Sequence, residues 1–389
     1  MNEARITSAR IDRLGTLLVG IGALAFTVLP LIVFKANRIL PGEPRALFDL
    51  LPGWGAAVLA CTLTLAALAA LFARDGRLRL LGALAGICAL ALALAQGADV
   101  LTPDGNRVVR IAPGAGFWIT LVALGLLATD ALTRLQPGPA ARVLILGLAL
   151  GAVLLALGSG RFDDLSIMRE YAVNAGRFGQ EARRHLQLAF GSLVAALAVA
   201  LPLGVVCHRV PRLRAGVLGA LNLVQTIPSI ALFGILMAPL AALAVAFPAL
   251  AALGVSGIGA APAAIALFLY SLLPIVANTV VGLGRVSPAA VDAARGMGFT
   301  DAQVLRDVEL PLALPAILTG IRIVLVQNIG MVTIAALIGG GGFGAFVFQG
   351  IGQTAIDLVL LGAIPTIVLA FAAAVVLDAL TDLTRRVPR

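Results

Sequence analysis

Long apolar runs alternate with short polar segments along the whole chain, and their spacing predicts helices that cross a membrane. A hydrocarbon core of about 30 Å needs roughly 20 apolar residues in a helix. Backbone groups in lipid must pair within their own segment, so runs of this length are expected to be helical. The expected spans are 14–34, 54–72, 80–97, 115–132, 143–158, 186–207, 215–238, 262–283, 312–338 and 356–379. The predicted fold class is therefore an all-α polytopic membrane protein with about ten transmembrane helices.

The polar segments divide this pattern into three parts. Residues 1–158 form an N-terminal extension of five spans, and residues 159–184 form a polar segment on the outer face. Residues 185–389 form a second five-span unit, which contains a polar segment at 285–311. The apolar stretch 239–261 is interrupted by Pro239, Pro248 and Gly254, so we expect an outer-face segment there, either re-entrant or interfacial.

Basic residues set the expected orientation. With the N-terminus in the cytoplasm, 17 Lys and Arg residues fall on the inner side and 10 on the outer side. Cytoplasmic loops carry an excess of Lys and Arg, so the N-terminus, the C-terminus and segment 285–311 are all predicted to be cytoplasmic. Arg322 lies within a span, where it is expected to snorkel or to pair with a polar neighbour.

Composition supports a membrane protein and argues against several functions. Hydrophobic residues make up 60% of the chain and charged residues 12%, and the mean hydropathy is +1.05. The net charge of +9 reflects arginines in short loops, so nucleic-acid binding is not expected. The N-terminal run is too long for a cleaved signal peptide and is read as an uncleaved anchor. Three separated cysteines, with His185 and His208 at the edges of one span, predict no metal site.

The polar segment 285–311 has its own local structure. Ser287-Pro288 is a helix start, with a capping hydroxyl and proline at the first helical position. Gly296 and Gly298 can end that helix, and Thr300 to Gln303 forms a capping box for a second one. Leu310-Pro311 is expected to stop the second helix. We therefore predict two short helices at roughly a right angle that protrude from the bilayer.

The spacing within this segment resembles a family signature. Asp292-Ala293-Ala294, Gly298 three residues later, and Val308, Leu310 and Pro311 after a further gap follow the pattern E-A-A-x3-G-x9-I-x-L-P. This pattern marks the cytoplasmic coupling loop of importer-type ATP-binding-cassette (ABC) permeases, with Asp292 and Val308 as conservative departures. The resemblance implies that residues 285–311, the coupling loop, seat in a groove of a separate ATPase. It also implies a second permease subunit, identical or homologous.

The chain itself does not resemble the ATPase. A phosphate-binding P-loop needs G-x4-G-K-[ST], and the only lysine is Lys35, at a membrane edge. The glycines at 339–342 and 344 are read as a flexible outer-face turn. No cofactor is expected on this chain, since ATP and Mg²⁺ belong to the partner ATPase.

Further stretches resemble permeases of osmoprotectant importers, which carry glycine betaine, choline or carnitine. These stretches begin at Gln225, Tyr270, Gly320 and Thr333. The resemblance as a whole covers about residues 185–385. The extra N-terminal spans resemble a longer subset of these permeases. The resemblance places the chain in a bacterial inner membrane. Recognition of a quaternary ammonium group generally uses an aromatic cage, and the spans after residue 185 offer Tyr270 and phenylalanines but no tryptophan. We therefore expect a periplasmic binding protein to capture the solute.

Polar residues inside apolar spans are the candidate substrate pathway, because such groups are costly in lipid and tend to face a cavity. The candidates are Gln225, Thr226, Tyr270, Asn278, Gln327 and Asn328. For each of them, a hydrogen bond that joins two helices is the alternative role. Pro228, just after the first two, is expected to kink its span.

Three other functions stay open at this point. The same machine could carry a polar amino acid such as methionine. A secondary transporter would need intramembrane Asp or Glu, whereas Asp357 and Asp378 fall at span ends. A membrane enzyme is disfavoured, because no cluster of His, Cys or carboxylate side chains is apparent.

Overall fold

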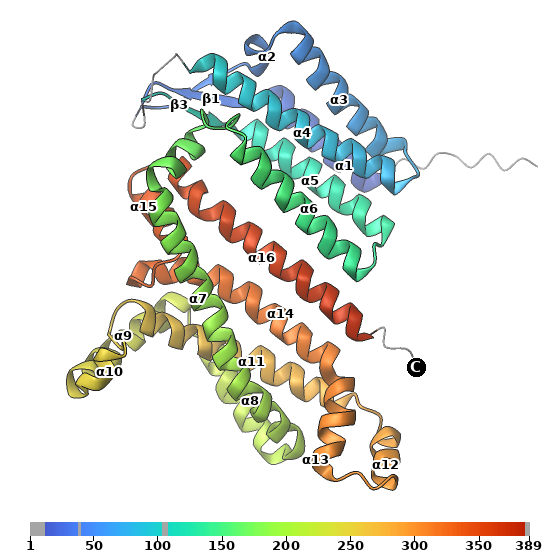
Figure 1. The fold of residues 1–389 in the computed structure, drawn as a ribbon, viewed down its shortest axis with the longest axis vertical. Helices are drawn as coiled ribbons and strands as arrows, with labels where there is room; N and C mark the ends of the chain where they lie inside the picture. Colours follow the sequence, from blue (N-terminus) through green and yellow to red (C-terminus); the bar gives the residue numbers. More distant parts are fainter. Residues whose placement is uncertain (1–11, 38–39, 103–107, 386–389) are drawn as a thin grey trace, which may run out of the picture. The chain divides into compact units, whose positions relative to one another are not determined.

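The structure is a computed structural model that describes residues 12–37, 40–102 and 108–385 (Figure 1). The chain divides into two compact units. The N-terminal unit comprises residues 1–137 and 149–172, and the C-terminal unit comprises residues 138–148 and 173–389. The terminal tails 1–11 and 386–389, whose arginines contributed to the predicted orientation, lie outside the described residues.

The N-terminal unit is a helical bundle with a small sheet at one end. Its helices are α1 (Arg13–Val28), α2 (Leu47–Leu50), α3 (Gly53–Phe72), α4 (Gly76–Leu101), α5 (Ala115–Leu135) and the second half of α6 (Pro139–Gly158). Helix α4 packs between α3 and α5, and α1 packs on α5. Fully buried Leu59 and Leu90 belong to the apolar core of this bundle. The predicted spans at 54–72, 80–97, 115–132 and 143–158 are confirmed as helices.

The predicted span 14–34 is wrong in its last six residues. Helix α1 ends at Val28, and Leu29 adopts an extended conformation before Pro30. Proline disfavours the helical conformation in the residue before it, which explains the end of the helix. The 16 residues of α1 reach only about 24 Å, short of a full crossing.

A three-stranded antiparallel sheet follows α1, which the sequence did not predict. Its order is β2 (Glu43–Arg45), β1 (Ile32–Lys35) and β3 (Arg110–Pro113). Ile32 lies opposite Pro113, and Ile32 and Ile111 are fully buried. In strands of only three or four residues, the alternation of apolar and polar positions is too short to distinguish a strand from a neighbouring apolar helix.

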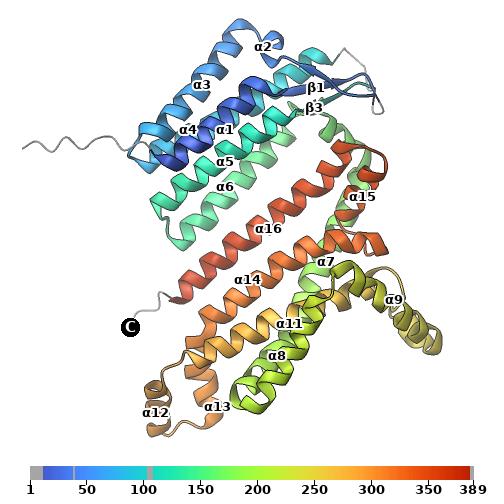
Figure 2. The same cartoon turned by 180° about the vertical axis from the view of Figure 1, so that it is seen from behind.

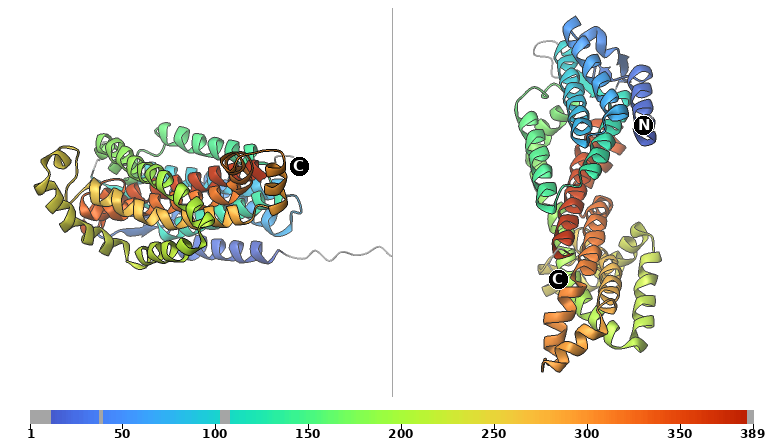
Figure 3. Two further views of the ribbon diagram at one scale, coloured as in Figure 1. Left: turned by 90° about the horizontal axis from the view of Figure 1, so that it is seen from below. Right: turned by 90° about the vertical axis from the view of Figure 1, so that its right-hand side faces the viewer.

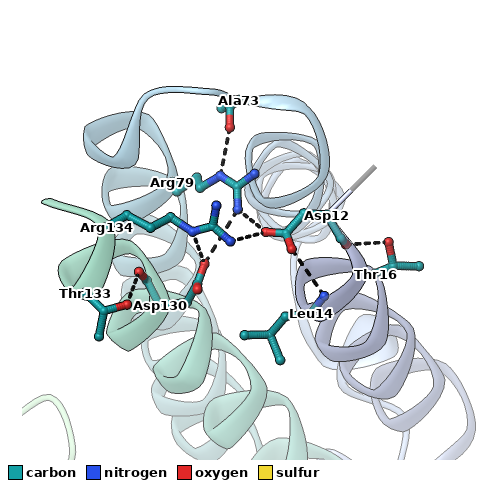
Figure 4. A network of polar contacts seen from close by, with 8 residues as sticks. All are labelled: Asp12, Leu14, Thr16, Ala73, Arg79, Asp130, Thr133 and Arg134. Carbon is teal, nitrogen blue, oxygen red and sulfur yellow. Dashed lines mark hydrogen bonds and ion pairs between the residues drawn. The ribbon is translucent and has the colours of Figure 1, made fainter. Parts of the chain in front are cut away.

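A network of charged side chains joins three helices at the other end of this bundle (Figure 4). Asp12 caps α1 and pairs with Arg79 of α4, and it lies 2.6 Å from Arg134 of α5. Arg134 also lies 2.7 Å from Asp130, one turn earlier in α5. Burial by itself would raise the pKa of Asp12. The hydrogen bond from Arg79, the backbone of Gly15 and the charges of the two arginines outweigh it, so the pKa is lowered.

The C-terminal unit contains the first half of α6 and the remaining helices. The remaining helices are α7 (Ser166–Arg209), α8 (Pro211–Thr226), α9 (Ser229–Ala246), α10 (Pro248–Ala252), α11 (Ala260–Gly284), α12 (Pro288–Gly296), α13 (Asp301–Gln303), α14 (Leu310–Ala335), α15 (Gly344–Gly352) and α16 (Ile356–Arg385). Helix α7 begins in the N-terminal unit and belongs to this one from residue 173 on. Helix α14 packs between α11 and α16. Helix α7 runs unbroken for 44 residues, so the predicted polar segment 159–184 is largely its first part.

The predicted seventh span, 215–238, is wrong as a single helix. Helix α8 ends at Thr226, Ile227 and Pro228 are extended, and α9 begins at Ser229. Proline lacks the N–H that would continue the helix, so Pro228 breaks the span rather than kinking it. Pro239, which was expected to begin an interruption, lies inside α9, and the helix continues to Ala246.

Opposite ends of the C-terminal unit carry different loops (Figures 1 and 2). Helices α12 and α13 lie beyond one end of α11 and α14, while α15 lies at the other end. The arm formed by α9 and α10 projects away from α12, as the left view of Figure 3 shows. The coupling loop and residues 239–261 therefore lie apart from each other in this unit (Figures 1 and 3).

Among the described residues, nine helices are long and apolar enough to cross a membrane. Helix α1 falls short in length, and the first half of the expected seventh span, α8, is not among the nine. The fold class of a mostly helical polytopic membrane protein is confirmed.

Candidate functional site

The glycine of the signature is the stop signal of its first helix. Gly298 has a φ of +88°, a conformation that side-chain-bearing residues rarely adopt. Its N–H donates to the carbonyl of Arg295 at 2.9 Å, and the N–H of Phe299 donates to that of Ala294 at 3.1 Å. These two bonds form a Schellman motif, which requires glycine at this position after the helix. The spacing from Ala294 to Gly298 is therefore a consequence of how α12 ends.

The start of α12 differs from its prediction in one respect. Pro288 occupies the first turn as expected, but the Ser287 side chain makes no capping hydrogen bond. The fixed backbone of Pro288 alone therefore defines this start.

The second helix of the loop begins as predicted and ends differently. The capping box is present, with the Thr300 hydroxyl and the Gln303 side chain bonded to each other's backbone N–H groups. Residues Val304–Glu309 then form a π-helix that continues directly into α14. Pro311 does not stop this helix, so the predicted break at Leu310-Pro311 is wrong. The wider π-turn rearranges the backbone bonds just before Pro311, which has no N–H to donate.

The signature residues present a mixed surface. Asp292, Ala293, Gly298 and Pro311 are exposed, whereas Val308 and Leu310 are half-buried. Ala294 is buried, and α12 packs on the π-helix. An added Cβ at Gly298 would meet no atom within 4 Å, so the space around it is open within this chain.

The base of the coupling loop is joined to α7 by an ion pair that the sequence analysis missed. Arg209, the last residue of α7, donates to the carboxylate of Glu309, which is only 3% exposed. Glu309 occupies the variable position of V-x-L-P, so the signature gave no reason to select it.

Two of the candidate pathway residues bind each other across the break between α8 and α9. The Gln225 side chain donates to the backbone carbonyl of Tyr270 at 2.8 Å, and the Tyr270 hydroxyl donates to the carbonyl of Ile227. Ile227 lies where the helix is interrupted, so Tyr270 satisfies a carbonyl that the broken helix leaves free. Thr226 is exposed and bonds only within its own helix, to Leu223.

Asn328 joins three helices, whereas its neighbour Gln327 does not. The Asn328 amide donates to the hydroxyls of Ser192 in α7 and Ser271 in α11, at 3.1 and 3.0 Å. All three side chains are buried. Among the described residues, the Gln327 side chain hydrogen-bonds to Met331, one turn away in its own helix, at 3.5 Å. Asn328 therefore has the alternative role, since its hydrogen bonds join α14 to two other helices.

Asn278 lines a cavity of about 370 Å³ at the end of the unit that carries the coupling loop. Other polar residues around it are Thr319, Arg285 and Arg385, from α14, the end of α11 and the end of α16. The Asn278 amide donates to Pro274 at 2.8 Å within its own helix. Of the predicted pathway residues, Asn278 alone lines this cavity, while the others lie elsewhere in the unit.

The glycine-rich turn after α14 is packed against α7. The N–H of Gly342, at a φ of +82°, donates to the Glu181 carboxylate at 2.7 Å. The N–H of Phe343 donates to Nδ1 of His185 at 3.3 Å, which leaves Nε2 to donate to the carbonyl of Ile329 at 3.0 Å. The turn was predicted, but its flexibility was not borne out by these contacts. His185 is fully buried.

Arg322 pairs with Asp378, so the second of its two expected roles is confirmed. Asp378 also lies 2.9 Å from Arg142 at the start of α6, and Arg142 reaches Asp382 at the same distance. Asp378 lies well inside α16, which continues to Arg385. Among the described residues, no three His, Cys, Asp or Glu side chains are placed to hold a metal ion.

The comparison with known proteins agrees with this architecture. Residues 193–386 match the family described as "Binding-protein-dependent transport system inner membrane component". The osmoprotectant import permease OsmW of Salmonella typhimurium is 45% identical over 197 residues, which is 51% of this chain and 86% of that protein. The chain belongs to this permease family. The permease is thus a multi-pass membrane subunit and is not itself catalytic.

Other relatives match a similar share of the permease. The carnitine transport permease OpuCB of Listeria monocytogenes is 37% identical and matches 48% of this chain and 78% of its own length. The choline permease OpuBB of Bacillus subtilis is 35% identical, with 52% and 87% covered. Residues 12–168 match a separate family, the N-terminal domain of the ABC transporter permease YehY. A crystal structure of the MetNI methionine transporter covers 54% of the permease at 21% identity, with a TM-score of only 0.47.

Proposed function

We propose that this permease forms the membrane pathway of an ATP-driven importer for a quaternary ammonium osmolyte such as glycine betaine. The observation that carries the proposal is the set of relatives, whose names specify osmoprotectant, carnitine and choline transport. The family model that matches residues 193–386 covers the coupling loop and all six candidate pathway residues.

The coupling loop supplies the mechanism. Asp292, Ala293 and Gly298 are exposed on a rigid helix whose end is fixed by the Schellman motif. Such a helix can seat in a groove of an ATPase and pass that protein's movement to α11, which ends at the loop, and to α14, which begins there. ATP and Mg²⁺ act on the ATPase, and this chain binds neither.

The remaining partners follow from the same scheme. Two permease chains frame one pathway, and a periplasmic binding protein delivers the solute to the outer face of a bacterial inner membrane, with both termini of the chain cytoplasmic. The cavity beside Asn278 adjoins the coupling loop end, where a transported solute would leave. Gln225 and Tyr270 hold the interrupted helix and shape the pathway wall.

The test is uptake by the complete importer. The permease, its ATPase and its binding protein are reconstituted in proteoliposomes, and ATP-dependent accumulation of labelled glycine betaine, choline and carnitine is measured, with methionine as a further arm. Accumulation of at least one quaternary ammonium solute, competed by the others, supports the proposal. Uptake of methionine alone would assign the permease to an amino-acid importer, and uptake without ATP would indicate a secondary transporter.

A further inference from the structure

The ion pair between Arg209 and Glu309 lies where two long helices meet the coupling loop. Arg209 ends α7, and Glu309 is the last residue of the π-helix before α14. The Glu309 side chain is 4% exposed and that of Arg209 is 38% exposed, so the carboxylate is enclosed and its partner reaches in from the surface. A buried carboxylate that loses its partner is strongly unfavourable, which makes this contact difficult to break while the loop keeps its place.

Apolar packing surrounds the same point. Leu283 of α11, with Ala313 and Ile317 of α14, forms a small buried cluster. Leu201 and Val205 of α7 pack against that cluster, as do Leu305 and Leu310 of the loop. The last turn of α7 is fixed as well, since Arg214 donates to the carbonyls of Cys207 and His208 at 3.1 and 3.2 Å. The loop base is therefore bound to α7 by charge and by apolar contact together.

The other end of α7 holds the far end of α14. Glu181 and His185 bind the turn at Gly342 and Phe343, and Ser192 binds Asn328 midway. Helix α7 thus contacts α14 near its start, its middle and its end. A displacement of the loop base that pulls on Arg209 would be carried along α7 to the opposite side of the unit.

We propose that Arg209 and Glu309 are a positioning pair that makes α7 move together with the coupling loop, so that ATPase motion reaches the glycine-rich turn after α14. The proposal rests on the proposed function, because it assigns these residues a part in coupling to the ATPase. Neither residue touches the solute or the nucleotide in this scheme. Their role is to transmit movement, and its loss should separate ATP hydrolysis from transport.

The first experiment measures solute imported per ATP hydrolysed in proteoliposomes that contain the complete importer. For Glu309→Gln and Arg209→Gln we expect ATP hydrolysis to persist while the ratio falls about tenfold, a typical size for a lost coupling contact. The charge-reversed double variant Arg209→Glu/Glu309→Arg should recover most of the ratio. Asp307→Asn is the matched control, because Asp307 lies in the same π-helix but is half-exposed and 3.9 Å from its neighbour Arg306.

The second experiment does not depend on the solute. Spin labels at Ala302 and Arg212, both exposed, report the distance between the loop and the start of α8 in the permease–ATPase complex. In the wild type this distance should stay the same when nucleotide is added, and in Glu309→Gln it should change or broaden.

Several outcomes would overturn the proposal. One is a Glu309→Gln variant whose ratio and distances match the wild type. Another is a parallel loss of hydrolysis, uptake and assembled complex without recovery in the double variant, which would indicate a purely structural contact. A wild-type importer that moves none of the tested solutes would contradict the proposed function instead, and the spin-label distances would still decide the role of the pair.

Discussion

The two units of the permease place their polar side chains differently. In the N-terminal unit the four-residue network of Asp12, Arg79, Asp130 and Arg134 lies at helix ends, on one side of the bundle. In the C-terminal unit, polar contacts recur along the helices, from Arg209–Glu309 through Asn328 to Glu181–Gly342.

This difference shows that the C-terminal unit keeps polar side chains, such as Asn328, in the middle of its apolar helices. Polar side chains in spans are costly, and a unit that only packs in lipid has no need of them. The N-terminal helices keep their charges near the ends, as expected of a structural bundle. The C-terminal helices accept a broken span at Ile227 and a buried Asn328, which fits a unit that must rearrange around a solute.

The largest expected effect is at the coupling loop. Gly298→Asp should reduce ATP-dependent uptake to background while membrane insertion stays normal, because it adds both a strained left-handed residue and a charge to the exposed end of α12. Uptake in proteoliposomes and the amount of membrane-inserted protein are the measurements.

Gly254→Asp provides the matched control. Gly254 has a φ of +89° and equally open space around it, but lies in the segment at the other end of the unit. Normal uptake by Gly298→Asp, or an equal loss in both variants, would contradict the special role of the loop.

The next effect is on the polar centre of the C-terminal unit. Asn328→Ala should lower the free energy of unfolding by about 1–2 kcal/mol, because it removes the contacts to Ser192 and Ser271 and leaves a small cavity. Denaturation of the purified permease in detergent measures this.

Gln327→Ala is the companion variant, since the hydrogen bond of Gln327 goes to Met331 in its own helix. It should change stability much less. If uptake rather than stability falls in Gln327→Ala, this residue belongs to the pathway and Asn328 to the scaffold.

A third variant addresses the N-terminal network. Asp12→Asn should lower the stability of that unit by about 1–2 kcal/mol, because it weakens bonds to two arginines at once. Solute imported per ATP should not change. Asp75→Asn, which alters a cap bonded only to the N–H of Arg77, is the control. A change in the transport ratio of Asp12→Asn would show that the N-terminal unit takes part in coupling.

The smallest expected effect is on pH dependence. The pKa of Asp12 is lowered from its ordinary value of 3.8, so the folded state favours the charged form. The stability that this provides is complete well above pH 3.8 and is lost as the pH falls below 3.8 through the lowered pKa. As the pH is lowered from 6 to 3, the unfolding temperature should therefore fall more steeply for the wild type than for Asp12→Asn. Identical pH profiles would mean that the arginines do not act on this carboxylate.

Much of this fold could be predicted from the sequence, and the helix ends that were predicted wrongly have physical causes. Apolar length predicted most of the spans, and the capping box predicted the helix at Thr300 correctly. The prolines were harder to interpret, because Pro228 breaks a helix while Pro239 and Pro311 lie inside helices. Proline's effect depends on whether neighbouring bonds can rearrange, which local sequence does not reveal.

The candidate site was predictable only where it follows a local rule. Gly298 and the residues of the signature could be found because helix ends need fixed spacings. Glu309 and its partner Arg209 are 100 residues apart, and nothing near either one indicates the other. The roles of Gln225, Tyr270 and Asn278 in transport stay predictions, although the contacts of each are now defined.

The π-helix lies at the end of the nine-residue interval between Gly298 and Val308 and affects the direction of the chain there. A π-turn holds one residue more than the α-helical turn that it replaces. Deleting a single residue from Val304–Glu309 would restore regular winding, and each residue of an α-helix advances by about 100° around the axis. In a helix that stayed α-helical throughout, one extra residue would turn everything before it by that angle. The π-turn takes up the extra residue, so the segment before it keeps its direction relative to α14. The π-turn thus sets the direction in which the exposed tip of the loop points from α14.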